Sequence, residues 1–277
     1  AYLANSSSAV RAMAIQAIRY TLAENDEIFD TVLHSVLIEM LTIMLRDTEL
    51  ENRRLALTTL NSAAHNKPDL IIPNLGLLIP LVMHESHINA ALIREVNMGP
   101  FKHKIDDGLE VRKVCLSSPS RRSQLTSQQS AYETLYSLME TAFSRINIVD
   151  FYDRIIAGLQ DEHDIRSLCN LMLTKLIVLD PDETARRLDA IATCYRQIIS
   201  IKLKDNAVKQ ELEKQEEAVK SCLRVSLLLH ASIPGASSVG GPQTGQHQIW
   251  HTYWEWIEKD YENSLKALRQ EGKESSY

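Results

Sequence analysis

The chain has 277 residues, of which 44% are hydrophobic, 9 are glycine and 8 are proline. Few glycines and prolines beside abundant Leu, Ile and Ala favour an all-helical protein over a strand-rich one. The formal net charge of −6 argues against a general nucleic-acid-binding protein, because such proteins carry a basic surface. No run approaches the roughly 20 apolar residues that a membrane span requires.

The first 85 residues predict two antiparallel helix pairs. Apolar residues recur at helical spacing over 7–22, with Met13 expected to face inward, and again over 29–44. Asp47 is expected to open the third helix, and Pro68 to stand in the first turn of the fourth, where a missing N–H costs nothing. The pairs start about 40 residues apart, a period typical of HEAT or armadillo repeats.

Residues 91–107 break the helical pattern and predict a β-hairpin. Leu92–Asn97 alternates in polarity only roughly and Phe101–Ile105 more cleanly, on either side of the turn signal Met98-Gly99-Pro100. A lone two-stranded hairpin is marginally stable in water, so this hairpin must pack against the helices or against a partner protein. Because its tip is apolar, we favour a partner contact over a hairpin folded flat on its own core.

The remaining chain returns to helical pattern between two loops of Ser, Gly and Pro. Helices are predicted to resume at Tyr132 and then over 148–159, 162–179, 182–201, 204–230 and 249–268. All three tryptophans fall in the last of these helices. We expect that helix to cap the end of the repeat array rather than to bind a ligand.

No catalytic or metal-binding motif is present. The P-loop, zincin and nucleophile-elbow patterns are missing, and His84 and His87 lack ligands at a familiar spacing. Asp106-Asp107 stands beside Gly108, which favours a turn and helix cap over an acid–base pair. We therefore predict a protein that is not an enzyme and uses no cofactor and no metal.

The four cysteines are scattered through apolar helical contexts without a C-x-x-C pair. This pattern predicts reduced thiols in a reducing compartment. We expect the protein in the cytoplasm and nucleus. The four cysteines are Cys115, Cys169, Cys194 and Cys222.

Three runs give the chain a recognisable family character: LNSAAHNKP at 60–68, LIREVNMGPFKH at 92–103 and DDGL at 106–109. They resemble the cullin-associated, neddylation-dissociated (Cand) proteins, and weaker similarity extends the match over most of residues 47–232. The resemblance implies a long HEAT-repeat solenoid that wraps around an unneddylated cullin bound to its RING subunit. In that family the C-terminal end packs on the cullin's N-terminal region, and its hairpin occupies the surface where the substrate-receptor adaptor binds.

The sequence also departs from the family. The Ser-rich segment at 117–130 interrupts a helix that is continuous in the family. The sequence after residue 232 diverges. The family's N-terminal arch, which covers the neddylation site, is missing. The chain is therefore expected to be a fragment, or the C-terminal partner of a separate N-terminal Cand half.

The predicted fold is all-α, a HEAT-repeat-like superhelical solenoid with an inserted β-hairpin and a C-terminal capping helix. The predicted segments are two helix pairs at 1–90, the hairpin at 91–108, further helices at 109–232 with a Ser-rich insert at 117–130, a linker at 233–248, and a helix and tail at 249–277.

The resemblance implies a scaffold that competes with the adaptor on the cullin and promotes adaptor exchange in cullin–RING ubiquitin ligases. No nucleic-acid or membrane partner is expected. The alternative is a HEAT-type adaptor that holds peptides or transport cargo in its concave groove. The expected partner-binding residues are Leu92, Arg94, Val96, Met98, Gly99, Pro100, Phe101, Lys102, His103 and Lys104.

Overall fold

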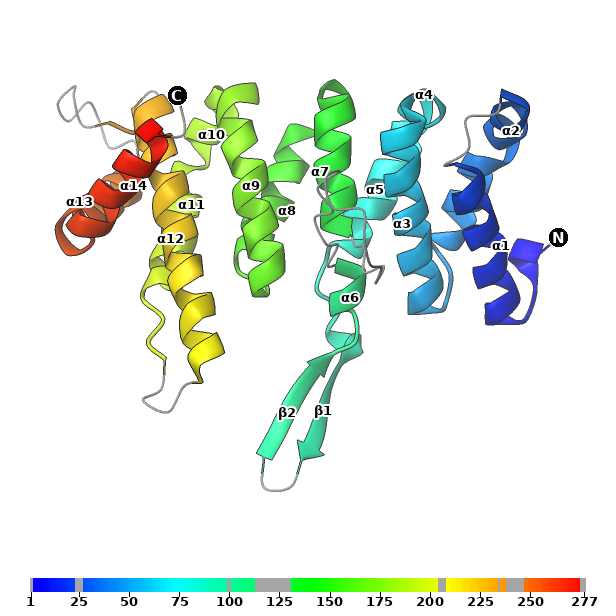
Figure 1. Ribbon diagram of the computed structural model, residues 1–277, viewed down its shortest axis with the longest axis horizontal. Coiled ribbons are helices and arrows are strands. Elements are labelled where there is room, and N and C mark those ends of the chain that lie inside the picture. The colour runs from blue at the N-terminus through cyan, green and yellow to red at the C-terminus, as the bar shows by residue number, and fades with distance from the viewer. Residues whose placement is uncertain are drawn as a thin grey trace. The chain divides into compact units, whose positions relative to one another are not determined.

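The computed structural model describes residues 2–22, 27–98, 101–112, 131–203, 208–233, 235–237 and 247–274. These residues form helices and their connections, apart from one two-stranded antiparallel sheet (Figure 1). The all-helical prediction with an inserted hairpin is therefore confirmed. The chain divides into two compact units, Ala1–Asn147 and Ile148–Tyr277. The Ser-rich insert expected at 117–130 lies outside the described residues.

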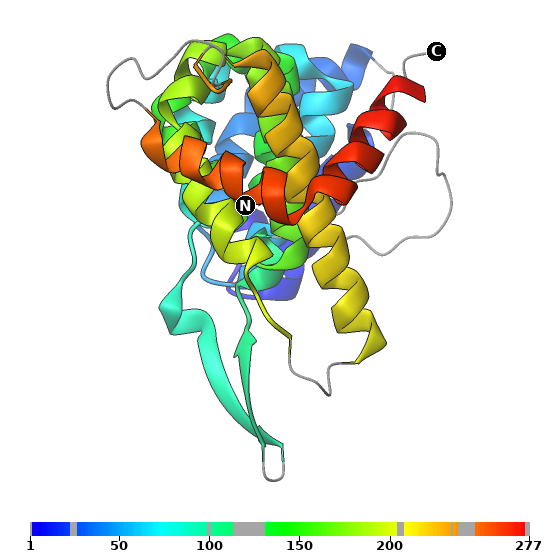
Figure 2. The same ribbon diagram turned by 90° about the vertical axis from the view of Figure 1, so that its left-hand side faces the viewer.

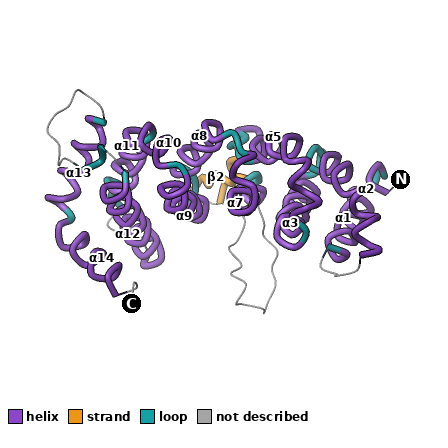
Figure 3. Tube along the Cα trace, turned by 90° about the horizontal axis from the view of Figure 1, so that it is seen from above, coloured by secondary structure: helices purple, strands orange, loops and turns teal. Residues whose placement is uncertain are grey.

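The first unit stacks its helices in two layers. Helices α1, α3 and α7 pack in one layer, and α2 and α5 pack in the other, as in HEAT-type arrays (Figure 3). The elements in chain order are η1 (Tyr2–Ala4), α1 (Ser8–Thr21), α2 (Glu27–Met44), α3 (Leu50–Asn66), α4 (Pro68–Ile71), η2 (Ile72–Asn74), α5 (Leu75–Glu85), η3 (Ala90–Leu92), β1 (Ile93–Met98), β2 (Phe101–Asp106), α6 (Leu109–Arg112), α7 (Ala131–Ala142) and η4 (Phe143–Arg145).

The inward face of α1 differs from the sequence prediction. Met13 is 61% exposed, whereas Ile15 and Leu22 are fully buried. The reason is a polar contact at the adjoining turn, where Arg11 donates to the carboxylate of Asp47 over 2.7 and 2.8 Å. Arg11 and Ile15 lie four residues apart and so share one helical face, which this ion pair turns towards α3.

Asp47 stabilises the turn before α3 rather than the helix itself. Its carboxylate accepts the N–H of Glu49 over 2.9 Å, and α3 begins one residue later, at Leu50. Hydrogen bonding to Arg11 lowers the pKa of Asp47 to about 2. Pro68 opens α4, as predicted, and the fourth predicted helix is divided into α4, η2 and α5.

The second unit has the same two-layer organisation. Helices α9, α12 and α14 pack in one layer, and α8, α11 and α13 in the other (Figure 3). Its elements are α8 (Ile148–Leu159), α9 (His163–Leu179), α10 (Pro181–Arg186), α11 (Leu188–Ile199), α12 (Lys209–Ser232), α13 (Gln248–Asp260) and α14 (Glu262–Glu274). No helix in the described ranges is long and apolar enough to cross a membrane.

Buried hydrogen bonds fix the helices of the second unit against each other. Tyr195 on α11 donates to the side chain of Asn170 on α9 over 2.7 Å, and Asn170 donates to Ser221 on α12 over 2.9 Å. The hydroxyl groups of Tyr253 and Ser226 lie 2.8 Å apart and join α13 to α12. A buried polar group without such a partner would cost free energy, so these contacts favour one packing arrangement.

Three of the four cysteines are described, and all three are buried free thiols of the second unit. Burial raises the pKa of the Cys222 thiol to about 12, and it also raises the pKa of Cys169 and Cys194. The thiols therefore stay protonated at neutral pH, which suits core packing rather than nucleophilic chemistry.

Two predicted helices are each divided in two. The segment predicted at 182–201 forms α10 and α11, which meet at Arg187. The single capping helix predicted at 249–268 forms α13 and α14, because the backbone leaves the helical region at Tyr261. There the Tyr261 N–H donates to Ile257, while the Tyr261 carbonyl accepts the first bond of α14 from Leu265.

Candidate functional site

The β-hairpin is the one non-helical element with regular structure in the described chain. Strands β1 and β2 pair antiparallel from Ile93 opposite Asp106 at the base to Met98 opposite Phe101 at the tip. Figures 1 and 2 show the hairpin extending away from the helices of the first unit. Residues 99 and 100, predicted as the turn, lie outside the described residues. The hairpin prediction is confirmed.

The register separates the hairpin into two faces of different character. Directly paired residues of antiparallel strands share a face. One face, here called the apolar face, contains the pairs Arg94–Ile105, Val96–His103 and Met98–Phe101. The other, the polar face, contains Ile93–Asp106, Glu95–Lys104 and Asn97–Lys102. The expected partner-binding residues of the two strands therefore divide between the faces: Lys102 and Lys104 lie on the polar face, and Arg94, Val96, Met98, Phe101 and His103 share the other by register.

The described side chains of the hairpin are largely open to solvent. Lys102 is 74% exposed in its side chain, Ile105 is 37% exposed, and Val96 is half-buried. Lys102 and Glu95 form only a long ion pair of 3.8 Å on the polar face. The strand side chains that the structure describes thus bury little surface against their own unit, so the stability of the hairpin depends on its base.

A buried arginine anchors that base. Arg112 in α6 is 2% exposed and pairs with Asp106 at the end of β2 over 2.6 Å. The Asp106 carboxylate also accepts the N–H of Gly108 over 3.0 Å, and the Asp107 N–H donates to the carbonyl of Leu92 over 3.0 Å. These contacts confirm the turn predicted at Asp106-Asp107-Gly108. They hold both strand ends against the helical layer.

Close packing at Gly108 tightens the same region. A Cβ atom on this residue would lie 3.0 Å from the Cδ1 of Leu92 and 3.3 Å from the carboxylate of Asp106. Leu92, expected among the binding residues, is half-buried in η3 beside this contact. This position favours a role for Leu92 in packing at the hairpin base over direct contact with a partner protein.

A second ion pair lies at the surface of the base. Arg94 donates to Asp107 over 2.7 and 3.2 Å, with side chains 59% and 39% exposed. The hydrogen bond from Arg94 lowers the pKa of Asp107, and the same bond raises the pKa of Arg94. Arg94, one of the expected partner-binding residues, remains accessible while it binds Asp107 of its own chain.

Residues of α3 and α5 complete the support beneath the hairpin. Arg53 pairs with Glu85, which is 7% exposed in its side chain, over 3.0 Å, and it also donates to the carbonyl of Asp47 over 2.8 Å. A cavity of about 40 Å³ separates this pair from Gly108 and Arg112. Sequence reasoning missed the roles of Glu85 and Arg112, because only tertiary packing shows that these charges are buried.

The histidines near this base form no metal centre. His87 contacts the carbonyl of Met83 over 2.8 Å, and His84 contacts Glu85 over 3.0 Å. Within the part of the chain that the structure describes, no three His, Cys, Asp or Glu residues are grouped as metal ligands.

Comparison with known proteins gives consistent matches across the chain. A family model, TIP120, described as TATA-binding protein interacting (TIP20), matches residues 70–258. That range includes the hairpin and the ion pairs of Asp106 with Arg112 and of Asp107 with Arg94.

Three relatives illustrate the similarity. The C-terminal part of cullin-associated NEDD8-dissociated protein 1 from Emericella nidulans is 44% identical over 270 residues, covering 98% of this chain and 24% of that protein. Cullin-associated NEDD8-dissociated protein 1 from Drosophila melanogaster is 37% identical, and the match covers 85% of this chain and 17% of that protein. Cullin-associated NEDD8-dissociated protein 2 from Rattus norvegicus is 35% identical, and the match covers 93% of this chain and 19% of that protein. The chain thus spans a quarter or less of each relative.

Proposed function

Since this chain belongs to the TIP120 family and matches the C-terminal region of cullin-associated NEDD8-dissociated (Cand) proteins, we propose that it is a non-catalytic scaffold that binds a cullin through its β-hairpin. The cullin is unneddylated and carries its RING subunit. The hairpin competes with the substrate-receptor adaptor for the cullin's N-terminal region, so that each weakens the binding of the other and adaptors exchange. A separate N-terminal Cand half is a further partner.

The observation that carries this proposal is a projecting hairpin with one apolar face. A strand pair adds nothing to the stacking of helix pairs, and a solvent-exposed apolar strand surface favours association. Val96 and Ile105 are apolar residues of this face whose side chains the structure describes, and the register pairs Met98 with Phe101 at the tip. We assign the cullin contact to this face.

The anchored base supports the same proposal. The bonds of Arg112, Asp106 and Gly108 restrict how the hairpin can tilt. A binding element that is already held in one orientation loses less entropy when a partner binds. Arg94 can exchange its exposed bond with Asp107 for an acceptor on the cullin.

The test compares the two faces in binding to a purified cullin–RING complex. Met98→Ala/Phe101→Ala should weaken binding about thirtyfold, the equivalent of about 2 kcal/mol for two contact residues at an interface. The matched control is Glu95→Ala/Asn97→Ala, which alters two polar-face residues outside the expected binding set and should leave the affinity within about threefold. Equal affinity of both variants and the unmodified chain would remove the hairpin from the interface.

A further inference from the structure

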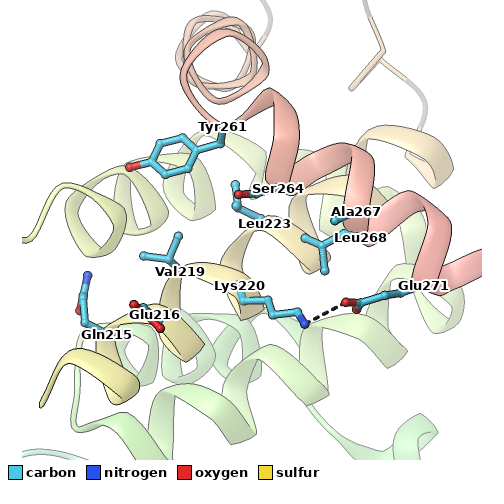
Figure 4. A pocket seen from close by; sticks show the side chains of 10 residues that line it. All are labelled: Gln215, Glu216, Val219, Lys220, Leu223, Tyr261, Ser264, Ala267, Leu268 and Glu271. Carbon is cyan, nitrogen blue, oxygen red and sulfur yellow. Dashed lines mark hydrogen bonds and ion pairs between the residues drawn. The ribbon is translucent and has the colours of Figure 1, made fainter. Parts of the chain in front are cut away.

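A pocket opens between α12 and α14 of the second unit, on elements unrelated to the hairpin. Its volume is about 370 Å³. Figure 4 shows side chains from both helices and the residue before α14 converging on it. Its lining includes Glu216, Val219, Leu223, Tyr261, Ala267 and Leu268.

The pocket lies on an apolar stripe of α12 that α14 covers only in part. Leu212, Val219 and Leu223 recur at spacings that place them on one helical face. Leu223 is buried, whereas Leu212 is 46% exposed. The first turns of α12 extend beyond α9 and α11 of the same unit (Figure 1). An apolar surface therefore continues from the pocket along α12.

The charges around the pocket differ between its two ends. At one end Lys220 and Arg224 both bind Glu271, over 3.0 and 3.4 Å, and the hydrogen bond from Lys220 lowers the pKa of Glu271. At the other end Glu216 forms no hydrogen bond or ion pair with any residue that the structure describes. Its carboxylate leaves an uncompensated negative charge beside the apolar stripe.

We infer that this groove binds an amphipathic helix of a partner protein that carries basic residues on its flank. The pocket volume is at the lower end of the range for binding sites and suits one or two bulky apolar side chains. A helix with apolar residues at i, i+4 and i+7 can lie along Val219 and Leu212 with its first anchor in the pocket. A Lys or Arg one turn away then meets Glu216.

Trp256 lies close enough to the pocket to report when a ligand binds there. The ring of Tyr261 lines the pocket, and Trp256 packs edge-on against it at 5.7 Å between centroids. Trp250 is fully buried and does not line the pocket. The indole N–H signal of Trp256 should therefore shift when the pocket fills, while that of Trp250 should move far less.

The experiment uses the 277-residue chain and a synthetic helical peptide with Leu at i, i+4 and i+7 and Lys on both flanks. Binding is followed by fluorescence anisotropy and by the indole signals. Ala267→Arg, at an exposed position that lines the pocket, should weaken binding by about tenfold or more. Gln270→Arg adds the same charge on α14 outside the pocket and should change affinity less than about twofold.

Charge is tested separately. A peptide with Glu in place of Lys should bind at least about fivefold more weakly, and Glu216→Lys should reverse that preference. Replacing the hairpin strands by a short linker should leave peptide binding unchanged, since the groove lies in the other unit. Circular dichroism verifies that each variant is folded. Absence of peptide binding, or equal affinity of Ala267→Arg and Gln270→Arg, would overturn the assignment of the groove, and equal binding of both peptides would overturn the basic partner.

Discussion

The neighbouring aspartates Asp106 and Asp107 at the base of the hairpin have different structural roles, because the arginine that each one binds differs in burial. Asp106 faces the buried guanidinium of Arg112, whereas Asp107 faces the exposed guanidinium of Arg94. A buried charge that loses its partner is costly, while an exposed pair contributes little to stability. The first pair therefore maintains the hairpin base, and the second leaves Arg94 available to another protein.

Replacing each aspartate by asparagine separates these roles. Asp106→Asn keeps the acceptor for the Gly108 N–H but removes the charge opposite Arg112, so it should lower the free energy of unfolding by about 2 kcal/mol. Asp107→Asn is the matched control and should leave stability unchanged. Urea denaturation followed by circular dichroism measures both. Equal stability of the two variants would contradict an anchoring role for Asp106.

Asp47 gives the fold an acid-sensitive contact. Its pKa is about 2 in the folded protein, below the usual value of about 3.9 for an unfolded chain. A carboxyl group with a lowered folded-state pKa stabilises the fold above its unfolded-state pKa, and this contribution is lost as the pH falls towards 2. After allowance for solvent screening it should amount to about 1 to 2 kcal/mol.

The test of this contact compares the unmodified chain with Asp47→Asn in urea at pH 6 and at pH 2.5. The stability difference between them should be clear at pH 6 and should shrink at pH 2.5, because part of the Asp47 population is then protonated. A difference that stays constant over this range would show that ionised Asp47 does not stabilise the fold.

Among the elements, sequence periodicity located the helices and the hairpin but not the helix breaks. The hairpin was predictable because alternation and a turn signal are local features. The break at Arg187 was not, because that side chain is held by Asp153 of α8 and Glu183 of α10, over 2.8 and 3.0 Å. The polarity of the two hairpin faces required the register, and the anchoring role of Arg112 required its burial. Both depend on tertiary structure.

Alanine substitution should have opposite effects on stability at Gly108, which is closely packed at the hairpin base, and at Gly76, which has open space around it. Gly108→Ala would place a Cβ 3.0 Å from Leu92, and it should destabilise the first unit by about 1 kcal/mol through overpacking. Gly76→Ala in α5 meets nothing within 4 Å, and it should stabilise the same unit by about 0.5 kcal/mol through helix propensity. Thermal denaturation of both variants gives the sign of each effect, and a stabilising Gly108→Ala would contradict the packing at the base.

At the scale of the molecule, each unit has its own layers and its own core. Unit two contains all three tryptophans, in α13, and its buried Tyr195–Asn170–Ser221 connections lie within it. A helical array whose stability comes from neighbouring repeats can be divided where such contacts are few. The hairpin belongs to the first unit and the α12/α14 groove to the second, so their functions can be tested separately.

A fragment of residues 148–277 should therefore fold without the first unit. We expect it to keep helical circular dichroism and the blue-shifted emission of buried Trp250 and Trp254, and to unfold in one cooperative transition. A fragment with solvent-exposed tryptophan emission in native buffer would show that the core of the second unit is incomplete without the first.

The most direct test of the central claim is a competition measurement on the cullin. The affinity of the chain for a cullin–RING complex is measured by titration with and without saturating adaptor. The chain should bind at least about tenfold more weakly when the adaptor is present, a coupling of about 1.4 kcal/mol. Met98→Ala/Phe101→Ala should reduce this effect. An affinity that is the same with and without adaptor would contradict competition at the hairpin.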